Sequence, residues 1–135
     1  MQNAILSAKE LIKKRKLIEE KKRKEFIVEI KDMGQFKFRT PDAFDVIDSQ
    51  AFKDGGYEDE YMIYTCMVEP NPRDAELQEA FECHEPFDIV DALFLPGEKQ
   101  GIAKALMEQA GYKEDIAKVV SEVKNGSSAA TSNSN

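Results

Sequence analysis

The sequence has little of what disulfide frameworks, metal centres and membrane spans require. Its 135 residues include two cysteines and one histidine, too few for a disulfide framework or a typical zinc site. No apolar run approaches the roughly 20 residues of a membrane-spanning helix. A secretory signal is not expected either, because basic residues at 13–16 and 21–24 occupy the place of its apolar region. These absences predict a soluble, intracellular protein.

Motifs that carry catalysis are also missing. The sequence has no Gly-rich phosphate loop, G-x-S-x-G elbow or H-E-x-x-H motif. His84 adjoins Cys83, but neighbouring residues on a helix point about 100° apart and do not form a nucleophilic pair. Carboxylates three residues apart, such as Asp88 and Asp91, are expected by chance among 26 acidic residues. We therefore predict no enzymatic activity, no cofactor, no metal site and no catalytic residue.

Charged residues are abundant and unevenly divided. Residues 1–31 hold ten Lys/Arg and five Asp/Glu, a net charge of +5, and residues 32–135 hold nine and twenty-one, a net charge of −12. The basic segment could contact phosphates, but Glu19 and Glu20 interrupt it and the acidic remainder would repel a polyanion. We favour a solvated helix, or one that docks on an acidic partner or on the acidic body of this protein. A nucleic-acid-associated regulator stays open as the alternative.

Residues 1–24 are predicted to contain a basic helix that begins near Ser7. Ser7 followed by Glu10 is a capping-box pattern, in which each side chain binds a free backbone amide of the first turn. The apolar residues of this helix form two pairs six positions apart, so their stripe drifts around the helix. We expect the helix to pack weakly, and to project from the domain or to rest on a partner.

At Glu25 the hydrophobic period changes from helical to alternating. Residues 25–31 and 35–39 each place apolar side chains on one face, and Asp32-Met33-Gly34 supplies a turn. The pattern predicts a β-hairpin over about 25–39. Because an isolated hairpin is only marginally stable in water, helices must cover its apolar face.

The segment from 40 to 68 is predicted to form two helices. Thr40 as N-cap and Pro41 in the first turn predict a helix start, and Phe44, Ile47 and Ala51 fall on one face of this helix. Residues 58–68 have an acidic first turn and are then apolar nearly all round, as in a central buried helix. Periodicity alone leaves a buried strand open for this second segment.

Four further helices are predicted downstream. They begin at Pro72, with Asn71 as N-cap, at Pro86, at about residue 97 and at about residue 113. Gly111 is expected to end the third of them. The last, 113–124, has apolar residues at helical spacing: Ile116, Val119, Val120 and Val123.

Taken together, these elements predict an α+β fold that is mainly α-helical. One hairpin packs against a cluster of short helices in a single domain, residues 25–124, with the basic helix of 1–24 before it. Residues 125–135 are small and polar, and we expect a disordered tail there.

Residues 69–112 carry three motifs. The first is Asp74, Ala75, Glu76, Leu77 and Gln78, the second is Leu95, Pro96, Gly97 and Glu98, and the third is the pair Gly111-Tyr112. These motifs, and more loosely the hairpin and the Thr40-Pro41-Asp42 helix start, resemble those of the XkdN-like tail assembly chaperones of phages and phage-derived tail elements. We interpret them as structural: Pro96 breaks one helix, Gly97 relieves the turn and Glu98 places charge in the next first turn.

The resemblance implies a non-enzymatic chaperone that binds the tape measure protein, keeps it soluble and helps to recruit tail tube subunits. It further implies action in the host bacterial cytoplasm, absence from the mature particle, and possible self-association. A structural component retained in the tail is an alternative. Such a chaperone needs an exposed apolar groove under a charged surface. Our candidate groove is lined by Phe87, Val90, Phe94 and Leu95 with Leu106 opposite, and the alternative is that these five side chains form the core.

Overall fold

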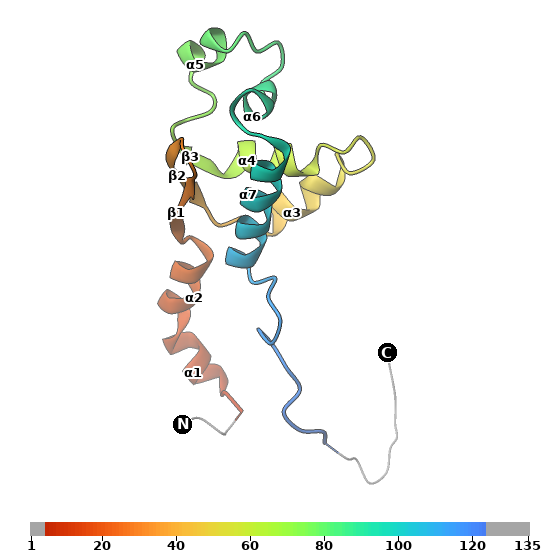
Figure 1. Ribbon diagram of the computed structural model, residues 1–135. Coiled ribbons are helices and arrows are strands. Elements are labelled where there is room, and N and C mark those ends of the chain that lie inside the picture. Colours follow the sequence, from red (N-terminus) through yellow and green to blue (C-terminus); the bar gives the residue numbers. More distant parts are fainter. Residues whose placement is uncertain (1–4, 124–135) are drawn as a thin grey trace.

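The structure, a computed structural model, describes residues 5–123 of the chain (Figure 1). Its helices and strands confirm the predicted α+β, mainly helical fold. In order, they are α1 (Ala8–Lys13), α2 (Arg15–Lys22), β1 (Glu25–Ile30), β2 (Gly34–Arg39), α3 (Ala43–Gln50), α4 (Glu58–Cys66), β3 (Met67–Glu69), α5 (Ala75–Ala80), α6 (Asp88–Leu93) and α7 (Pro96–Gln109). The predicted tail, 125–135, lies outside the described residues.

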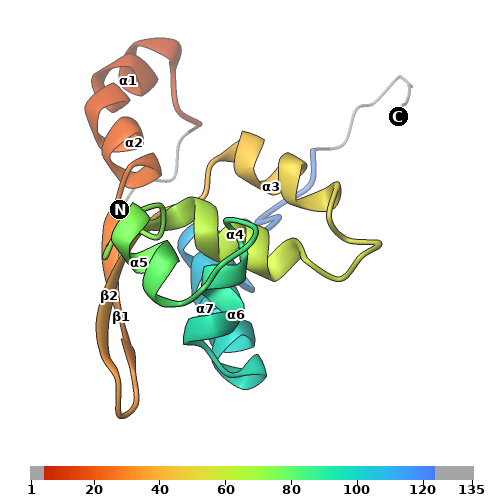
Figure 2. The ribbon, with the colours of Figure 1, turned by 90° about the horizontal axis from the view of Figure 1, so that it is seen from above.

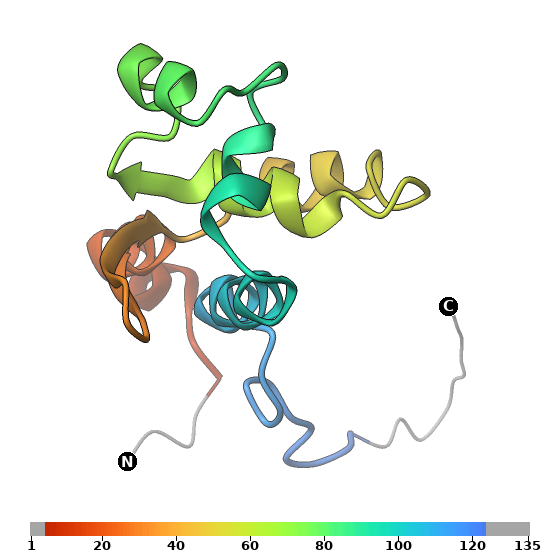
Figure 3. The same ribbon diagram turned by 45° about the horizontal axis from the view of Figure 1, so that its top comes forward.

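The sheet has three antiparallel strands in the order β1-β2-β3. The predicted hairpin is confirmed, with Phe26 opposite Phe38 and Val28 opposite Phe36. The prediction of a helix through residue 68 is wrong at its end, because α4 passes directly into β3 and Met67 pairs with Phe38 (Figure 3). A strand of three residues is too short to leave an alternating pattern, and its ladder depends on a partner far away in the sequence.

The core lies between the hairpin and the helices. Helix α4 crosses the middle of the molecule and packs against α3, α6 and α7, while the hairpin lies along one side of this cluster (Figure 2). Phe38 of β2 is fully buried, and the ring of Phe36 meets that of Phe94 edge-on at 5.1 Å between centroids. The helices therefore cover the apolar hairpin face, as the marginal stability of an isolated hairpin requires.

The N-terminal segment forms two short helices instead of one. The chain turns at Lys14, between α1 and α2, and the capping box of Ser7 with Glu10 is present as predicted. Neither helix contains a buried residue. We call residues 8–24 the N-terminal arm, which extends from β1 away from α5 (Figure 1).

Three predicted helix starts are wrong by a few residues. Helix α3 is capped by Asp42 and not by Thr40, whose hydroxyl instead donates to the carbonyl oxygen of Lys24 at 2.7 Å. Helix α5 is capped by Asp74 and not by Asn71, whose side chain accepts from the backbone of Arg73. Each segment offers two capping residues, and contacts elsewhere decide between them. Similarly, α6 begins at Asp88, two residues after the predicted Pro86.

Helix α7 agrees with its predicted range of 97–110 and is followed by Gly111 at a φ of 100°. The predicted helix after it is wrong for the described residues 113–123, which form no helix. Their apolar side chains are exposed and have nothing to pack against. Without packing, a helix of this length is marginal in water, and β-branched residues weaken it further. The exposed set is Ile116, Val119, Val120 and Val123.

Candidate partner-binding surface

The five residues of the predicted groove do not line an open groove together. Val90, Phe94 and Leu106 are buried in the core, because α4 and its neighbours cover the faces of α6 and α7 that carry them. Phe87 is half-buried, and Leu95 is 66% exposed at the start of α7. Helical spacing places Phe87, Val90 and Phe94 on one side of their segment, but spacing does not show whether another helix covers that side.

The first family motif builds the entry to α5. Asp74 caps this helix, since its Oδ1 accepts from the backbone N–H of Leu77 at 2.9 Å. The side-chain amide of Gln78 donates to the carbonyl oxygens of Pro72 and Pro86, at 2.8 and 3.0 Å. Gln78 thereby links Pro72, before α5, to Pro86, after it. Leu77 is half-buried, whereas Ala75 and Glu76 are exposed.

The second motif builds the corner between α6 and α7. Glu98 accepts from the backbone N–H of Leu95 at 2.8 Å, and Pro96 is the first residue of α7, where its missing N–H costs nothing. The prediction that Gly97 relieves the turn is wrong. Gly97 lies inside the helix without a positive φ, and a Cβ there would meet open space.

Helix α3 buries polar side chains and exposes large apolar ones. Its buried residues are Asp45 and Ser49, whereas Phe44 is 76% exposed and Ile47 is 65% exposed. Ala51 is exposed as well, so the three residues predicted to share one face, Phe44, Ile47 and Ala51, all lie toward solvent. We call Phe44 and Ile47, which lie three residues apart on the outer side of the helix, the α3 apolar face.

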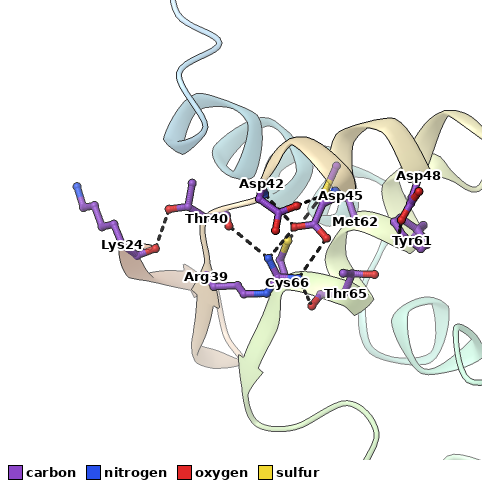
Figure 4. Close-up of polar contacts among 10 residues, drawn as sticks. All are labelled: Lys24, Arg39, Thr40, Asp42, Asp45, Asp48, Tyr61, Met62, Thr65 and Cys66. Atoms are coloured by element: carbon purple, nitrogen blue, oxygen red, sulfur yellow. Dashed lines mark hydrogen bonds and ion pairs between the residues drawn. The ribbon is translucent and has the colours of Figure 1, made fainter. Parts of the chain in front are cut away.

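An ion pair explains why α3 turns its polar side inward (Figure 4). Arg39 of β2 donates from Nη1 to Oδ2 of Asp45 at 2.6 Å and from Nη2 to Oδ1 at 3.2 Å. It also donates to the backbone oxygen of Thr65 in α4, at 3.3 Å. Burial opposes ionisation of Asp45, but hydrogen bonds from Arg39 and Asp42 outweigh it and hold the pKa of Asp45 below its usual value.

A second ion-pair network, in which Glu60 is buried, joins α4, α6 and α7. The ammonium group of Lys99 donates to Oε2 of Glu60 at 2.7 Å and also contacts Asp91. These two hydrogen bonds raise the pKa of Lys99. Oε1 of Glu60 is buried and has no hydrogen-bond partner among the described residues.

The cysteines and the histidine do not assemble into a reactive site. Burial raises the pKa of the Cys66 thiol to about 12, which leaves no appreciable thiolate at neutral pH. Cys83 and His84 lie in the turn before α6, where Asp88 accepts from the backbone N–H groups of His84 and Glu85. Residues 5–123 contain no cluster of three metal-ligating side chains. No helix in this part of the chain combines the length and apolar character needed to cross a membrane.

Comparison with known proteins gives the family. No curated protein and no solved structure matches the chain. A family model described as a phage XkdN-like tail assembly chaperone matches residues 8–124. The match includes the N-terminal arm, the sheet, all of the helices and the exposed segment after α7. The chain therefore belongs to the family of XkdN-like phage tail assembly chaperones.

Proposed function

We propose that this protein binds the tape measure protein, keeps that long chain soluble while a phage tail is assembled, and assists formation of the tail tube. In this proposal it acts without catalysis in the host bacterial cytoplasm and leaves before the particle is complete. Family membership supports the general role. The single observation that carries the specific role is the α3 apolar face, which is exposed while Asp45 on the opposite side of the helix pairs with Arg39.

Two properties make the α3 apolar face suitable for an aggregation-prone helical client. Phe44 and Ile47 are neighbours on one helix, so they can pack against the apolar stripe of another helix. Burying both side chains would contribute about 3 to 6 kcal/mol before the costs of association. The exposed carboxylates of Asp42 and Asp48 flank them and would keep the complex soluble.

Co-expression with the tape measure protein tests this proposal. We expect Phe44→Ser/Ile47→Ser to shift the client from the soluble to the insoluble fraction, because serine cannot replace the apolar contact. The matched control is Ile27→Ser/Tyr112→Ser, which removes two other side chains that are more than half exposed and should leave the client soluble. A client that stays soluble with Phe44→Ser/Ile47→Ser would refute the assignment of this face.

The remaining accessible residue of the predicted groove is tested in the same assay. Leu95→Ser removes an exposed side chain from the corner before α7 and is expected to retain the client. Loss of the client in this variant alone would move the binding surface from α3 to the corner between α6 and α7. Retention in the finished particle is a separate question, and mass spectrometry of purified tails would find the protein if it were a structural component instead.

A further inference from the structure

The N-terminal arm is a charged helical surface that no other part of residues 5–123 covers. Residues 8–24 hold nine Lys/Arg and three Asp/Glu, and α1 and α2 bury none of their residues. Within residues 5–123, every ion pair joins residues after the arm, so its cations have no carboxylate partner there. Leu11, Ile12 and Leu17 are also about half exposed or more on the same helices.

A surface of the opposite charge lies in residues 74–91, which we call the acidic lobe. This segment contains α5, the following turn and the first part of α6, and it holds seven Asp/Glu and no Lys or Arg. Asp74 and Asp88 bind backbone amides, and Asp91 pairs with Lys99. The other four carboxylates are exposed and form no ion pair among the described residues: Glu76, Glu79, Glu82 and Glu85.

The fold keeps these two surfaces apart within one chain. Figure 1 shows the N-terminal arm at one end of the molecule and α5 at the other, with the sheet and α7 between them. A chain in this structure does not neutralise its own arm with its own acidic lobe. A second copy carries a surface of complementary charge and is present at the same concentration as the arm.

We propose that the N-terminal arm of one copy docks on the acidic lobe of a second copy. In this contact Lys21, Lys22 and Arg23 of one copy bring positive charge to the exposed glutamates of the lobe of the other copy. Leu17, one helical turn before Lys21, packs beside Phe81 of the lobe, which is 44% exposed. Because two different surfaces meet, the contact is heterologous and leaves a free arm on one copy and a free lobe on the other. Association can therefore continue beyond a dimer.

Sedimentation velocity of the purified full-length chain, without any client, tests the contact. We expect species larger than a monomer at about 50 mM salt that increase with protein concentration and decrease toward about 500 mM salt, since salt screens exposed charges. Lys21→Glu/Lys22→Glu/Arg23→Glu should weaken association about tenfold or more. The control Lys104→Glu/Lys113→Glu/Lys118→Glu changes the net charge equally on exposed positions outside both surfaces and should associate as the wild type does.

Charge exchange between the two surfaces gives the decisive result. Glu76→Lys/Glu79→Lys/Glu82→Lys in the lobe should also yield monomers, because arm and lobe are then both basic. Mixing this lobe variant with the arm variant should restore association, since each now carries the complement of the other. Circular dichroism confirms that each variant is folded.

Three results would overturn the proposal: a wild-type monomer at all concentrations, an arm variant that associates normally, or a mixture that stays monomeric. A monomer whose arm shifts RNA or DNA in a salt-dependent manner would assign the arm to nucleic acid instead. Self-association uses the arm and the lobe, whereas tape measure binding is assigned to the α3 apolar face. A monomeric wild type would therefore leave the expected co-expression result unchanged, and an insoluble client would leave the expected sedimentation result unchanged.

Discussion

Arg39 and Asp45 form a two-point ion pair that joins the hairpin to α3, with donor–acceptor distances of 2.6 and 3.2 Å. The side chain of Asp45 is only 10% exposed, whereas that of Arg39 is 35% exposed. The pair therefore lies at the edge of the core, where an uncompensated charge is costly although water screens part of it. Because Arg39 at the end of β2 binds Asp45, the side of α3 that carries Asp45 faces the core and the opposite side faces solvent.

Asp45→Asn should lower the free energy of unfolding by about 2 kcal/mol, because the variant weakens the bond to Arg39 and leaves its guanidinium without a counter-charge. Urea denaturation monitored by circular dichroism measures this difference. Asp48→Asn is the matched control in the same helix, with an expected change within about 0.5 kcal/mol, since Asp48 is exposed. Equal stability of the two variants would mean that the ion pair does not hold α3.

The same carboxylate predicts a pH dependence. The folded-state pKa of Asp45 lies below its unfolded value of about 3.9, so Asp45 stabilises the fold above that pH. This contribution is lost as the pH falls through the folded-state pKa. Asp88 also has a lowered pKa, from backbone hydrogen bonds with Glu85 and His84. We therefore compare Asp45→Asn with the wild type between about pH 2 and pH 6, and expect a shallower loss of stability in the variant.

Features fixed by neighbouring residues were predictable from the sequence. The hairpin needs only alternation and a turn, and the capping box needs only Ser7 and Glu10, three residues apart. Helix α7 was predictable for the same reason, since Pro96 begins it and Gly111 follows its end. The second family motif also forms a local corner, where the roles of Pro96 and Glu98 were predictable and that of Gly97 was not.

Features that depend on distant partners were not predictable. Thr40 does not cap α3, because it binds Lys24 across the hairpin, and β3 exists only because β2 provides its ladder. The orientation of α3 depends on Arg39, so no hydrophobic pattern within the helix reveals that Phe44 faces outward. The predicted groove failed for a related reason, since helical periodicity does not identify the element that covers each face.

Lys99 is expected to be essential for stability. Lys99→Met removes the cation that pairs with the buried Glu60 and should lower the free energy of unfolding by about 3 kcal/mol, because a buried carboxylate is left unpaired. Asp91 is half exposed and can turn toward water. Adding Glu60→Leu to Lys99→Met should recover most of the loss, since an apolar side chain needs no partner there. Urea denaturation of both variants measures the effect, and no recovery in the double variant would contradict this explanation.

Phe87 and Phe44 should respond in opposite ways to truncation. Phe87 contacts three aromatic rings, with centroid distances of 5.4 Å to Phe52, 5.7 Å to Tyr61 and 5.0 Å to Tyr64. Phe87→Ala should therefore lower the free energy of unfolding by about 2 to 3 kcal/mol. Phe44→Ala removes a side chain with few contacts and should change it by less than about 0.5 kcal/mol.

Chemical denaturation of the two variants side by side distinguishes a core residue from a binding residue. A large loss in Phe44→Ala would show that Phe44 is packed in solution, and the α3 apolar face would then be unavailable to a client. A neutral Phe87→Ala would show that the aromatic cluster adds little, which would return Phe87 to the residues accessible to a partner. The expected pattern, a destabilised Phe87→Ala and a stable Phe44→Ala, allows loss of client binding in Phe44 variants to be attributed to the surface and not to unfolding.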